Sequence, residues 1–461
     1  MLGFGKQVEI VGSTIVQSVE AERRARARRI VDAWKRYEGN HPKPLLPTGT
    51  DPKGADNTTV NLARKTVDIA AFYLFGNPIA FEVGNQESER DDWLKACWEA
   101  NRQGSLLLEF GTSAGVTGDG FLRLYPARKE RGETFPRIVS LDAANVEMET
   151  DPLDIADIVR FVVTFTGVVD GKARAYRHLI ARSGNQWEII EQESRGDSTS
   201  WITTNTERWP YAFAPIFHCK NLPNPHVLYG RSDIEADVLR LNDAISFVVS
   251  NINRILRVHG HPQLALTGTT AEKLDRAIDN IICLPAPESK ILATPYVEDL
   301  TAHFDQLKSL REAYHELTSV PEIATGKLDS VGQLSGLALQ ILYAPLVQLV
   351  TVKRTFYGEM LMALCKALLE LGGQATAEWI TIQWPQILPT DRKAEADTAL
   401  SLHEIGVSRD TLLTELGYDP DDEAEKRKTE QEADLEAQRT AFDRGQLGGG
   451  NPYQNNNENG A

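Results

Sequence analysis

The residues that come closest to a catalytic pattern are Gly-Thr-Ser-Ala-Gly at positions 111–115. Their spacing is that of a nucleophile elbow, in which a serine lies on a sharp turn between a strand and a helix and attacks a carbonyl carbon. Residues 116–120, Val-Thr-Gly-Asp-Gly, instead predict a turn that leads into a strand. The sequence also offers no histidine partner for Ser113, so we interpret the segment as a glycine-rich turn without catalytic function.

Phosphate chemistry and zinc chemistry are not supported by the sequence either. Residues 49–54 (GTDPKG) lack the spacing and the terminal Gly-Lys-Ser/Thr of a phosphate loop. His315-Glu316 and His403-Glu404 begin like the zinc motif HExxH, but neither pair has a second histidine four residues after the first. We therefore expect no ATPase, nuclease or protease activity.

Two smaller clusters of polar residues also fail to predict a metal site. His259 and His261 lie at a predicted helix end, where histidines more often cap or pack than bind metal. Asp421-Asp422-Glu423 fits either a weak cation contact or the charged first turn of a helix. We expect no cofactor and no bound metal.

Composition indicates a globular protein with more than one domain. The chain has 461 residues, more than one hydrophobic core usually supports. The net charge of −16 argues against a surface that grips nucleic acid throughout, but allows one past which DNA slides. Four widely spaced cysteines without a Cys-x-x-Cys pair predict a reducing cytosol rather than disulfides or zinc. The most apolar run, Leu337–Val352, stops at Lys353-Arg354 and is too short and interrupted for a membrane span.

Five arginines crowd the middle of a helix predicted over residues 13–38. They admit two interpretations: a solvated helix face, or a subunit interface with an acidic neighbour, because an acidic protein has few positions for so much positive charge. These candidate interface residues are Arg23, Arg24, Arg26, Arg28 and Arg29.

The segments that follow predict an α+β fold that is mostly helical. Further helices are expected over residues 61–75 and 88–110, with a short strand at 79–83 between them. Between residues 118 and 204, β-branched and aromatic runs separated by turn residues predict an antiparallel sheet. Asp170-Gly171 between two such runs predicts a tight hairpin.

Two long helices then flank a small α/β insert. In the first, apolar residues recur at steps of four and three from Ile234 to Ile255, behind a capping box formed by Ser232 and Glu235. So narrow a stripe on a rod of about 42 Å predicts packing against neighbours along one side. The second helix is expected over residues 298–320, and the pair can hold the insert, residues 262–294, away from the main body.

The C-terminal third is predicted to be helical as well. A polar loop with two glycines precedes a helix expected over residues 335–371, in which Pro345 predicts a kink. A short returning strand follows at residues 381–384. Residues 390–444 predict acidic helices with breaks at Gly406 and Gly417, before a low-complexity tail that we expect to be disordered.

Several short segments together resemble those of a known family. No single segment is decisive, but their order and spacing are. They are Tyr37–Pro42 (YEGNHP), Asn61–Asp68 (NLARKTVD) with Tyr73–Pro78 (YLFGNP), Tyr229–Glu235 (YGRSDIE) with Leu241–Ala244 (LNDA), Gln333–Ala338 (QLSGLA), Trp384–Pro389 (WPQILP), Gly406–Ser408 (GVS) and Thr411–Leu413 (TLL). Over roughly residues 30–430 the chain resembles the portal protein of tailed double-stranded DNA bacteriophages, in the form typical of siphophages of Gram-positive hosts. It departs from the family at Asn242, where an apolar residue is common, and in its N-terminal arginines.

The resemblance implies a homo-oligomeric ring of about twelve copies around a DNA channel. This ring would assemble in the host cytoplasm and lie at the portal vertex of the virion capsid. The implied regions of one subunit are a wing over residues 1–230, a first stem helix over 231–261, a clip over 262–296, a second stem helix over 297–321, a tunnel loop, kinked tunnel helix and return to the wing over 322–389, a helical crown over 390–444, and a disordered tail over 445–461.

The resemblance also implies partners and the residues that meet them. The expected partners are double-stranded DNA bound without sequence specificity, the terminase large subunit, head-completion or adaptor proteins, and capsid and scaffold proteins, with no membrane. Pro345 would let the tunnel helix bend. The tunnel loop would line the channel with Thr325, Lys327, Asp329, Ser330 and Gln333, and the clip would dock partners through Gln263, Leu264, Thr270, Asp275, Glu288 and Lys290.

Two interpretations from other classes stay open at this point. One is a serine hydrolase that acts through Ser113, and the other is a cytoplasmic scaffold or tail-adaptor protein without a DNA channel. A ring with a central pore, seen by electron microscopy of the purified protein, would separate a portal from both.

Overall fold

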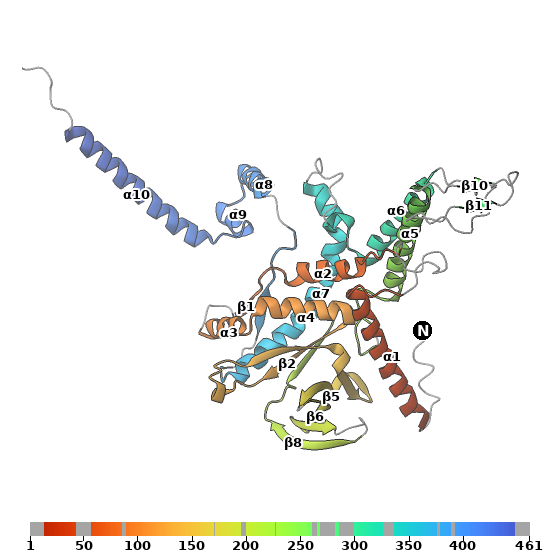
Figure 1. The fold of residues 1–461 in the computed structure, drawn as a ribbon. Helices are drawn as coiled ribbons and strands as arrows, with labels where there is room; N and C mark the ends of the chain where they lie inside the picture. Colours follow the sequence, from red (N-terminus) through yellow and green to blue (C-terminus); the bar gives the residue numbers. More distant parts are fainter. Residues whose placement is uncertain are drawn as a thin grey trace, which may run out of the picture. The chain divides into compact units, whose positions relative to one another are not determined.

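The chain divides into two compact units, Met1–Ile387 and Leu388–Ala461. The first contains helices α1–α7 and strands β1–β12, and the second contains α8–α10 (Figure 1). The computed structural model describes residues 13–42, 57–84, 89–169, 171–194, 200–225, 227–260, 265–267, 282–284, 299–325, 336–375, 379–388 and 392–447. The fold is mixed α and β, as the sequence predicts.

Four helices form the N-terminal part: α1 (Ser13–Tyr37), α2 (Leu62–Phe75), α3 (Glu89–Ala100) and α4 (Gln103–Thr117). α2 begins where the Asn61 side chain accepts a hydrogen bond from the Arg64 amide. The turn predicted at residues 111–115 is wrong, because these residues lie inside α4. Their small side chains serve packing, since a Cβ atom at Gly111 would lie 2.7 Å from the Phe75 ring.

The predicted antiparallel sheet is present and is joined by further strands. A five-stranded meander has the order β4-β5-β6-β7-β8, and its two-residue hairpin connects Val169 to Lys172, as predicted. A three-stranded sheet has the order β3-β2-β9, and β1 pairs with β12 from the far end of the chain. The strands are β1 (Ala80–Val83), β2 (Asp119–Tyr125), β3 (Arg137–Leu141), β4 (Val146–Asp151), β5 (Asp154–Val169), β6 (Lys172–Ser183), β7 (Gln186–Ser194), β8 (Trp201–Trp209), β9 (Ile216–Lys220) and β12 (Ile380–Gln383).

The long helices lie close to their predicted bounds. α5 (Ala236–Gly260) packs against α6 (Thr301–Thr318), and α7 (Gly336–Leu371) contains Pro345. The predicted capping box is wrong: α5 begins four residues after Ser232, whose hydroxyl donates to the Val116 carbonyl in the last turn of α4. Between α5 and α6 the strands β10 (Ala265–Thr267) and β11 (Ile282–Leu284) pair in parallel. The helix predicted over residues 270–280 lies outside the described residues.

The second unit contains α8 (Arg392–Glu404), α9 (Arg409–Glu415) and α10 (Pro420–Leu447). The two breaks fall at Gly406 and Gly417, as predicted. The Ser408 side chain caps α9 by accepting a hydrogen bond from the Thr411 amide.

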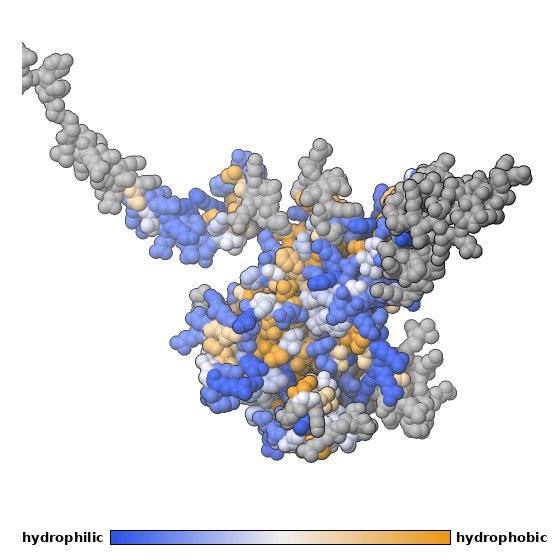
Figure 2. Space-filling view, viewed as in Figure 1, coloured by the Kyte–Doolittle hydropathy of each residue, from blue (hydrophilic) through white to orange (hydrophobic). Residues whose placement is uncertain are grey.

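Apolar packing between α2, α3, α4 and the second half of α7 forms the main core of the first unit. Trp98, Phe110, Tyr357 and Leu364 are completely or almost completely buried in it. Figure 2 shows apolar residues on the viewed face as well, and Phe72 of α2 and Ile341 of α7 are 56% and 65% exposed. In the described part of the chain, no helix combines the length and the apolar character that crossing a bilayer requires.

Candidate functional site at the base of α5 and α7

The segment that leads into α5 is hydrogen-bonded to the C-terminal turn of α4. The Asp233 amide donates to the Gly115 carbonyl at 2.9 Å, and the Asn221 amide donates to the Gly118 carbonyl at 2.9 Å. Glycine allows this approach, because a Cβ atom at Gly115 would lie 2.8 Å from the Asp233 carboxylate. Backbone hydrogen bonds therefore hold the segment before α5 to the end of α4.

A buried ion pair joins the start of α5 to the middle of α7. Lys353 Nζ lies 2.6 Å from Asp233 Oδ2, and the two side chains are 1% and 3% exposed. Asn221 Nδ2 donates to the other oxygen of Asp233 at 2.9 Å, and Tyr357 donates its hydroxyl to Asn221 Oδ1 at 2.9 Å. Burial raises the pKa of Tyr357 well above its ordinary value, so the hydroxyl keeps its proton. Both oxygens of Asp233 thus have partners, which buried charges require.

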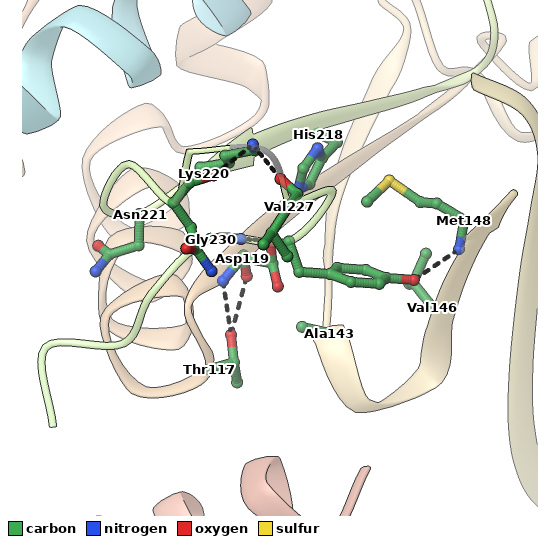
Figure 3. A network of polar contacts seen from close by, with 12 residues as sticks. Thr117, Asp119, Ala143, Val146, Met148, His218, Lys220, Asn221, Val227 and Gly230 are labelled. Carbon is green, nitrogen blue, oxygen red and sulfur yellow. Dashed lines mark hydrogen bonds and ion pairs between the residues drawn. The ribbon is translucent and has the colours of Figure 1, made fainter. Parts of the chain in front are cut away.

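A second buried carboxylate, Asp119, connects α1 to the same region through Arg26. Asp119 Oδ1 accepts hydrogen bonds from the Gly230 amide at 2.8 Å and from His218 Nε2 at 2.9 Å. Its Oδ2 accepts from Arg26 Nη2 at 3.2 Å. Figure 3 shows Asp119 between Thr117, Gly230 and His218, which come from three separate segments.

Arg26 uses the rest of its guanidinium group to hold the sheet and the Tyr229 ring. Its Nη1 donates to the carbonyls of Ala143 and Val146, each at 3.1 Å, and its Cζ atom lies 3.8 Å from the centre of the Tyr229 ring. The Tyr229 hydroxyl in turn accepts from the Met148 amide at 3.1 Å. Arg26, Asp119 and His218 form one group, and Asn221, Asp233, Lys353 and Tyr357 form a second; we call the two groups together the polar joint.

A row of polar side chains along α5 holds an extended segment, residues 58–62. Asn242 Oδ1 accepts from the Leu62 amide at 2.9 Å, Ser246 Oγ from the Val60 amide at 3.1 Å, and Ser250 Oγ from the Thr58 amide at 2.9 Å. The three side chains recur every fourth residue and lie in fully buried positions. Asn242, a departure from the family at sequence level, is therefore one of the residues that fix this segment.

The parts of α7 before and after Pro345 differ in burial. From Leu346 onward one face of the helix is completely buried, as at Leu346, Val350 and Leu361, whereas Ile341 and Leu342 before Pro345 are exposed. Pro345 is exposed and lines a groove of about 370 Å³ together with Leu317 of α6 and Val238 of α5. The part of α7 after Pro345 is thus in the core, whereas none of its described residues before Pro345 is buried.

The arginines of α1 do not act as one group. Arg23 pairs with Glu147 at 3.3 Å and with Glu149 at 2.9 Å, and Arg26 belongs to the polar joint. Arg24, Arg28 and Arg29 are exposed. Arg23 and Arg26 are therefore engaged within the chain.

Most of the predicted channel and clip residues lie outside the described part of the chain. Thr325 ends a short 3₁₀ turn, Glu322–Thr325, and the other four tunnel-loop residues fall outside the described ranges. The six predicted clip residues also lie outside them. Within the described residues, no group of three histidine, cysteine or acidic side chains is arranged to hold a metal ion. The polar joint itself lacks a nucleophile with an activating base. Its role is therefore structural: it holds neighbouring helices and strands together.

Sequence reasoning missed the polar joint. Lys353 follows a long apolar run, so the local sequence suggests only that the run ends there. Its partner Asp233 lies 120 residues earlier in the chain. A usable signal was present in α5, where Asn242, Ser246 and Ser250 interrupt an apolar helix at four-residue spacing.

Comparison with known proteins identifies a family. The sequence profile described as phage portal protein, SPP1 Gp6-like, matches residues 17–437. No curated protein matches significantly. Among solved structures, a chain in the neck of an empty GTA particle computed with C6 symmetry aligns with a TM-score of 0.46 and 14% identity, over 85% of this chain and 94% of that one. A chain in the neck of a native GTA particle computed with C12 symmetry aligns with a TM-score of 0.37 and 13% identity, over 82% and 94%.

Proposed function

Because the chain belongs to the SPP1 Gp6-like family of phage portal proteins, we propose that about twelve copies form its ring, and that this ring docks the terminase motor and later the head-completion proteins. As a portal protein, the chain is a non-enzymatic component of the virion at the capsid vertex, where an oligomeric ring surrounds the DNA channel. The number of copies and the identity of the docking partners are the parts that we propose.

The contrast along α7 is the observation that carries the mechanical part of the proposal. A helix that guides moving DNA needs one end fixed in the body of the subunit and another end that is free to face the channel. The part of α7 after Pro345 is fixed by the core and by Lys353, and the part before Pro345 exposes Ile341 and Leu342. Pro345 interrupts the backbone hydrogen bonds between the two, which favours bending there.

We propose that the tunnel loop lets DNA slide without gripping it. The sequence from Thr325 to Gln333 has one lysine, Lys327, one acid, Asp329, and polar Ser330. Each fixed cation that neutralises a phosphate adds salt-dependent affinity, so a sparse supply of cations favours movement. Free rings should therefore bind duplex DNA weakly at physiological salt.

Lys327→Ala tests this role. We expect it to alter DNA packaging or retention while rings still assemble, and we expect Ser113→Ala, inside α4, to leave packaging unchanged as a control. Tight, salt-resistant binding of DNA to wild-type rings would refute the sliding loop. Normal packaging after replacement of the whole loop by Gly-Ser would refute it as well.

We further propose that residues 262–296 form the docking clip, with Gln263, Leu264, Thr270, Asp275, Glu288 and Lys290 as its contacts. The support is that α5 and α6 pack together and both lead into this insert, whose strands pair with each other. Deletion of residues 264–292 should spare the fold of the first unit and abolish attachment of motor and tail. Phage that carry this deletion and still have normally attached tails would disprove the docking role.

Electron microscopy and native mass spectrometry test the ring itself. We expect particles with a central pore and a mass of about twelve subunits. Only monomers or dimers at micromolar concentration would contradict the proposal.

A further inference from the structure

Two surfaces of opposite charge lie at the two ends of α4. Its first residue, Gln103, lines a groove formed with β1, α3 and β12, and its last turn, at Thr117, lies beside α1. A helix of 15 residues is about 22 Å long, so side chains on the two surfaces do not meet within one subunit. Figure 1 shows α3 and α1 on opposite sides of the first unit.

The outward face of α1 carries positive charge around one apolar residue. Ile30 and Ala33 are buried on the inward face, while Arg28, Val31 and Lys35 follow one another at steps of three and four residues on the opposite face. All three are exposed, and Val31 is exposed by 47%. Among the described residues, neither Arg28 nor Lys35 forms an ion pair. We call these three residues the basic face of α1.

The groove at the other end of α4 is acidic and has an aromatic floor. Its volume is about 1480 Å³. The rings of Phe81 and Trp98 stack with their centres 5.0 Å apart, and Trp384 adds further apolar surface. Its charged lining residues are five acids and one base: Glu82, Glu89, Asp91, Asp92, Glu99 and Lys95.

The rim of this groove has negative charge that is not neutralised within the described part of the subunit. Glu89, Asp92 and Glu99 are exposed on α3 and form no salt bridge with a described residue. An acidic groove repels DNA and most of the surface of this acidic chain, so its partner must be a basic segment.

We propose that the basic face of α1 in one subunit binds the acidic groove of the next subunit in the ring. Val31 meets the aromatic floor, and Arg28 and Lys35 pair with the acidic rim on either side of it. Because the two surfaces lie on opposite sides of one unit, the contact is heterologous, the type of contact that forms a ring when the rotation between neighbours closes. The inference deepens the proposed function and rests on it. Arg23 and Arg26 take no part, since they are bound within their own chain.

Charge reversal on each surface, followed by their combination, tests the contact. The first variant carries Arg28→Glu and Lys35→Glu, the second carries Asp92→Lys and Glu99→Lys, and the third carries all four changes. A control with Lys426→Glu and Lys428→Glu makes the same change in net charge as the first variant, on exposed positions of α10. The full-length proteins are compared by native mass spectrometry and sedimentation at low and high salt, with circular dichroism to verify folding.

We expect each two-residue reversal to raise the protein concentration needed for ring formation about tenfold or more. The four-residue variant should recover most of this loss, and the α10 control should assemble like the wild type. If wild-type protein forms rings and both reversals assemble equally well, the inference is overturned while the portal ring stands. Disruption by both reversals without recovery in the combined variant overturns the pairing of these two surfaces. Absence of rings from the wild-type protein overturns the proposed ring and this contact together.

Discussion

α5 and α10 are helices of similar length, 25 and 28 residues, that are stabilised in different ways. α5 is fixed along its length: its start is hydrogen-bonded to α4, one polar row holds residues 58–62, and Ile245 and Ile252 are buried. α10 shows only local contacts among its described side chains, such as Lys426 with Glu423 at 2.9 Å. Figure 2 shows the described part of α10 as almost uniformly hydrophilic.

The first turn of α10 explains how this helix can form although none of its described side chains is buried. Asp421, Asp422 and Glu423 lie there, which agrees with the second of the two interpretations given for this cluster. Their negative charge opposes the positive end of the helix dipole, and Asp419 accepts a hydrogen bond from the Asp421 amide. Such terms contribute about 0.3–1 kcal/mol each, whereas burial of apolar side chains such as Ile245 and Ile252 in α5 contributes several times more.

The largest expected effect compares Lys353 of α7, whose partner Asp233 lies just before α5, with Lys426 of α10. Lys353→Met leaves Asp233 charged in a buried site, and we expect the free energy of unfolding of the first unit to fall by about 3–5 kcal/mol. The double variant Lys353→Met with Asp233→Leu should recover much of this loss, because no unpaired charge remains. Lys426→Met on α10 is the control and should change the free energy by less than about 0.5 kcal/mol. A loss below about 1 kcal/mol for Lys353→Met, measured by urea unfolding, would show that the ion pair does not anchor α5 to α7.

The polar row of α5 should have the next largest effect. Asn242→Leu removes the acceptor for the Leu62 amide, and an unsatisfied buried amide costs about 1–3 kcal/mol. Hydrogen exchange should accelerate most at residues 58–62, which the row holds. The matched change on an exposed helix is Ser401→Ala in α8, where the lost bond is to the Asp397 carbonyl of the same helix, and it should be nearly neutral. Equal exchange at residues 58–62 in wild type and Asn242→Leu would contradict the role of the row.

Low pH should reduce the free energy of unfolding of the first unit, which contains α5. Burial and the neighbouring Arg123 lower the pKa of His178 to about 4, below its ordinary value of 6.5. Below pH 6.5 the unfolded chain binds a proton that the folded chain does not, so stability is lost as the pH falls toward 4. We expect His178 to contribute about 1–2 kcal/mol of this loss, allowing for solvent screening.

His178→Asn isolates that contribution. Asparagine retains an acceptor for Arg123, whose Nη1 lies 2.7 Å from His178 Nδ1, but does not titrate. The difference in unfolding free energy between pH 7 and pH 4.5 should be smaller in the variant than in the wild type. Identical pH dependence in the two proteins would show that His178 does not carry the effect.

The sequence predicts features that depend on local patterns, and it does not predict features that depend on contacts between distant segments. The bounds of α5 and the breaks at Gly406 and Gly417 come from local patterns, and both were predicted closely. The ion pair of Lys353 with Asp233 depends on packing between segments 120 residues apart, which periodicity does not show. The failed turn at residues 111–115 has the same cause, because its glycines serve contacts with Phe75 and Asp233 rather than a change of chain direction.

The smallest predicted effect uses the same substitution in both helices. Alanine to glycine in a helix interior costs about 1 kcal/mol through backbone entropy, independently of side-chain contacts. In α5, Ala244→Gly should lower the unfolding free energy of the whole first unit by about that amount, because α5 unfolds together with the elements bound to it. In α10, Ala424→Gly should leave the first unit unchanged and raise hydrogen exchange about fivefold within α10 alone, since only local bonds hold that helix. If Ala424→Gly lowered the stability of the first unit as much as Ala244→Gly does, α10 would have to be stabilised by the same cooperative packing as α5, and the distinction between the two helices would fail.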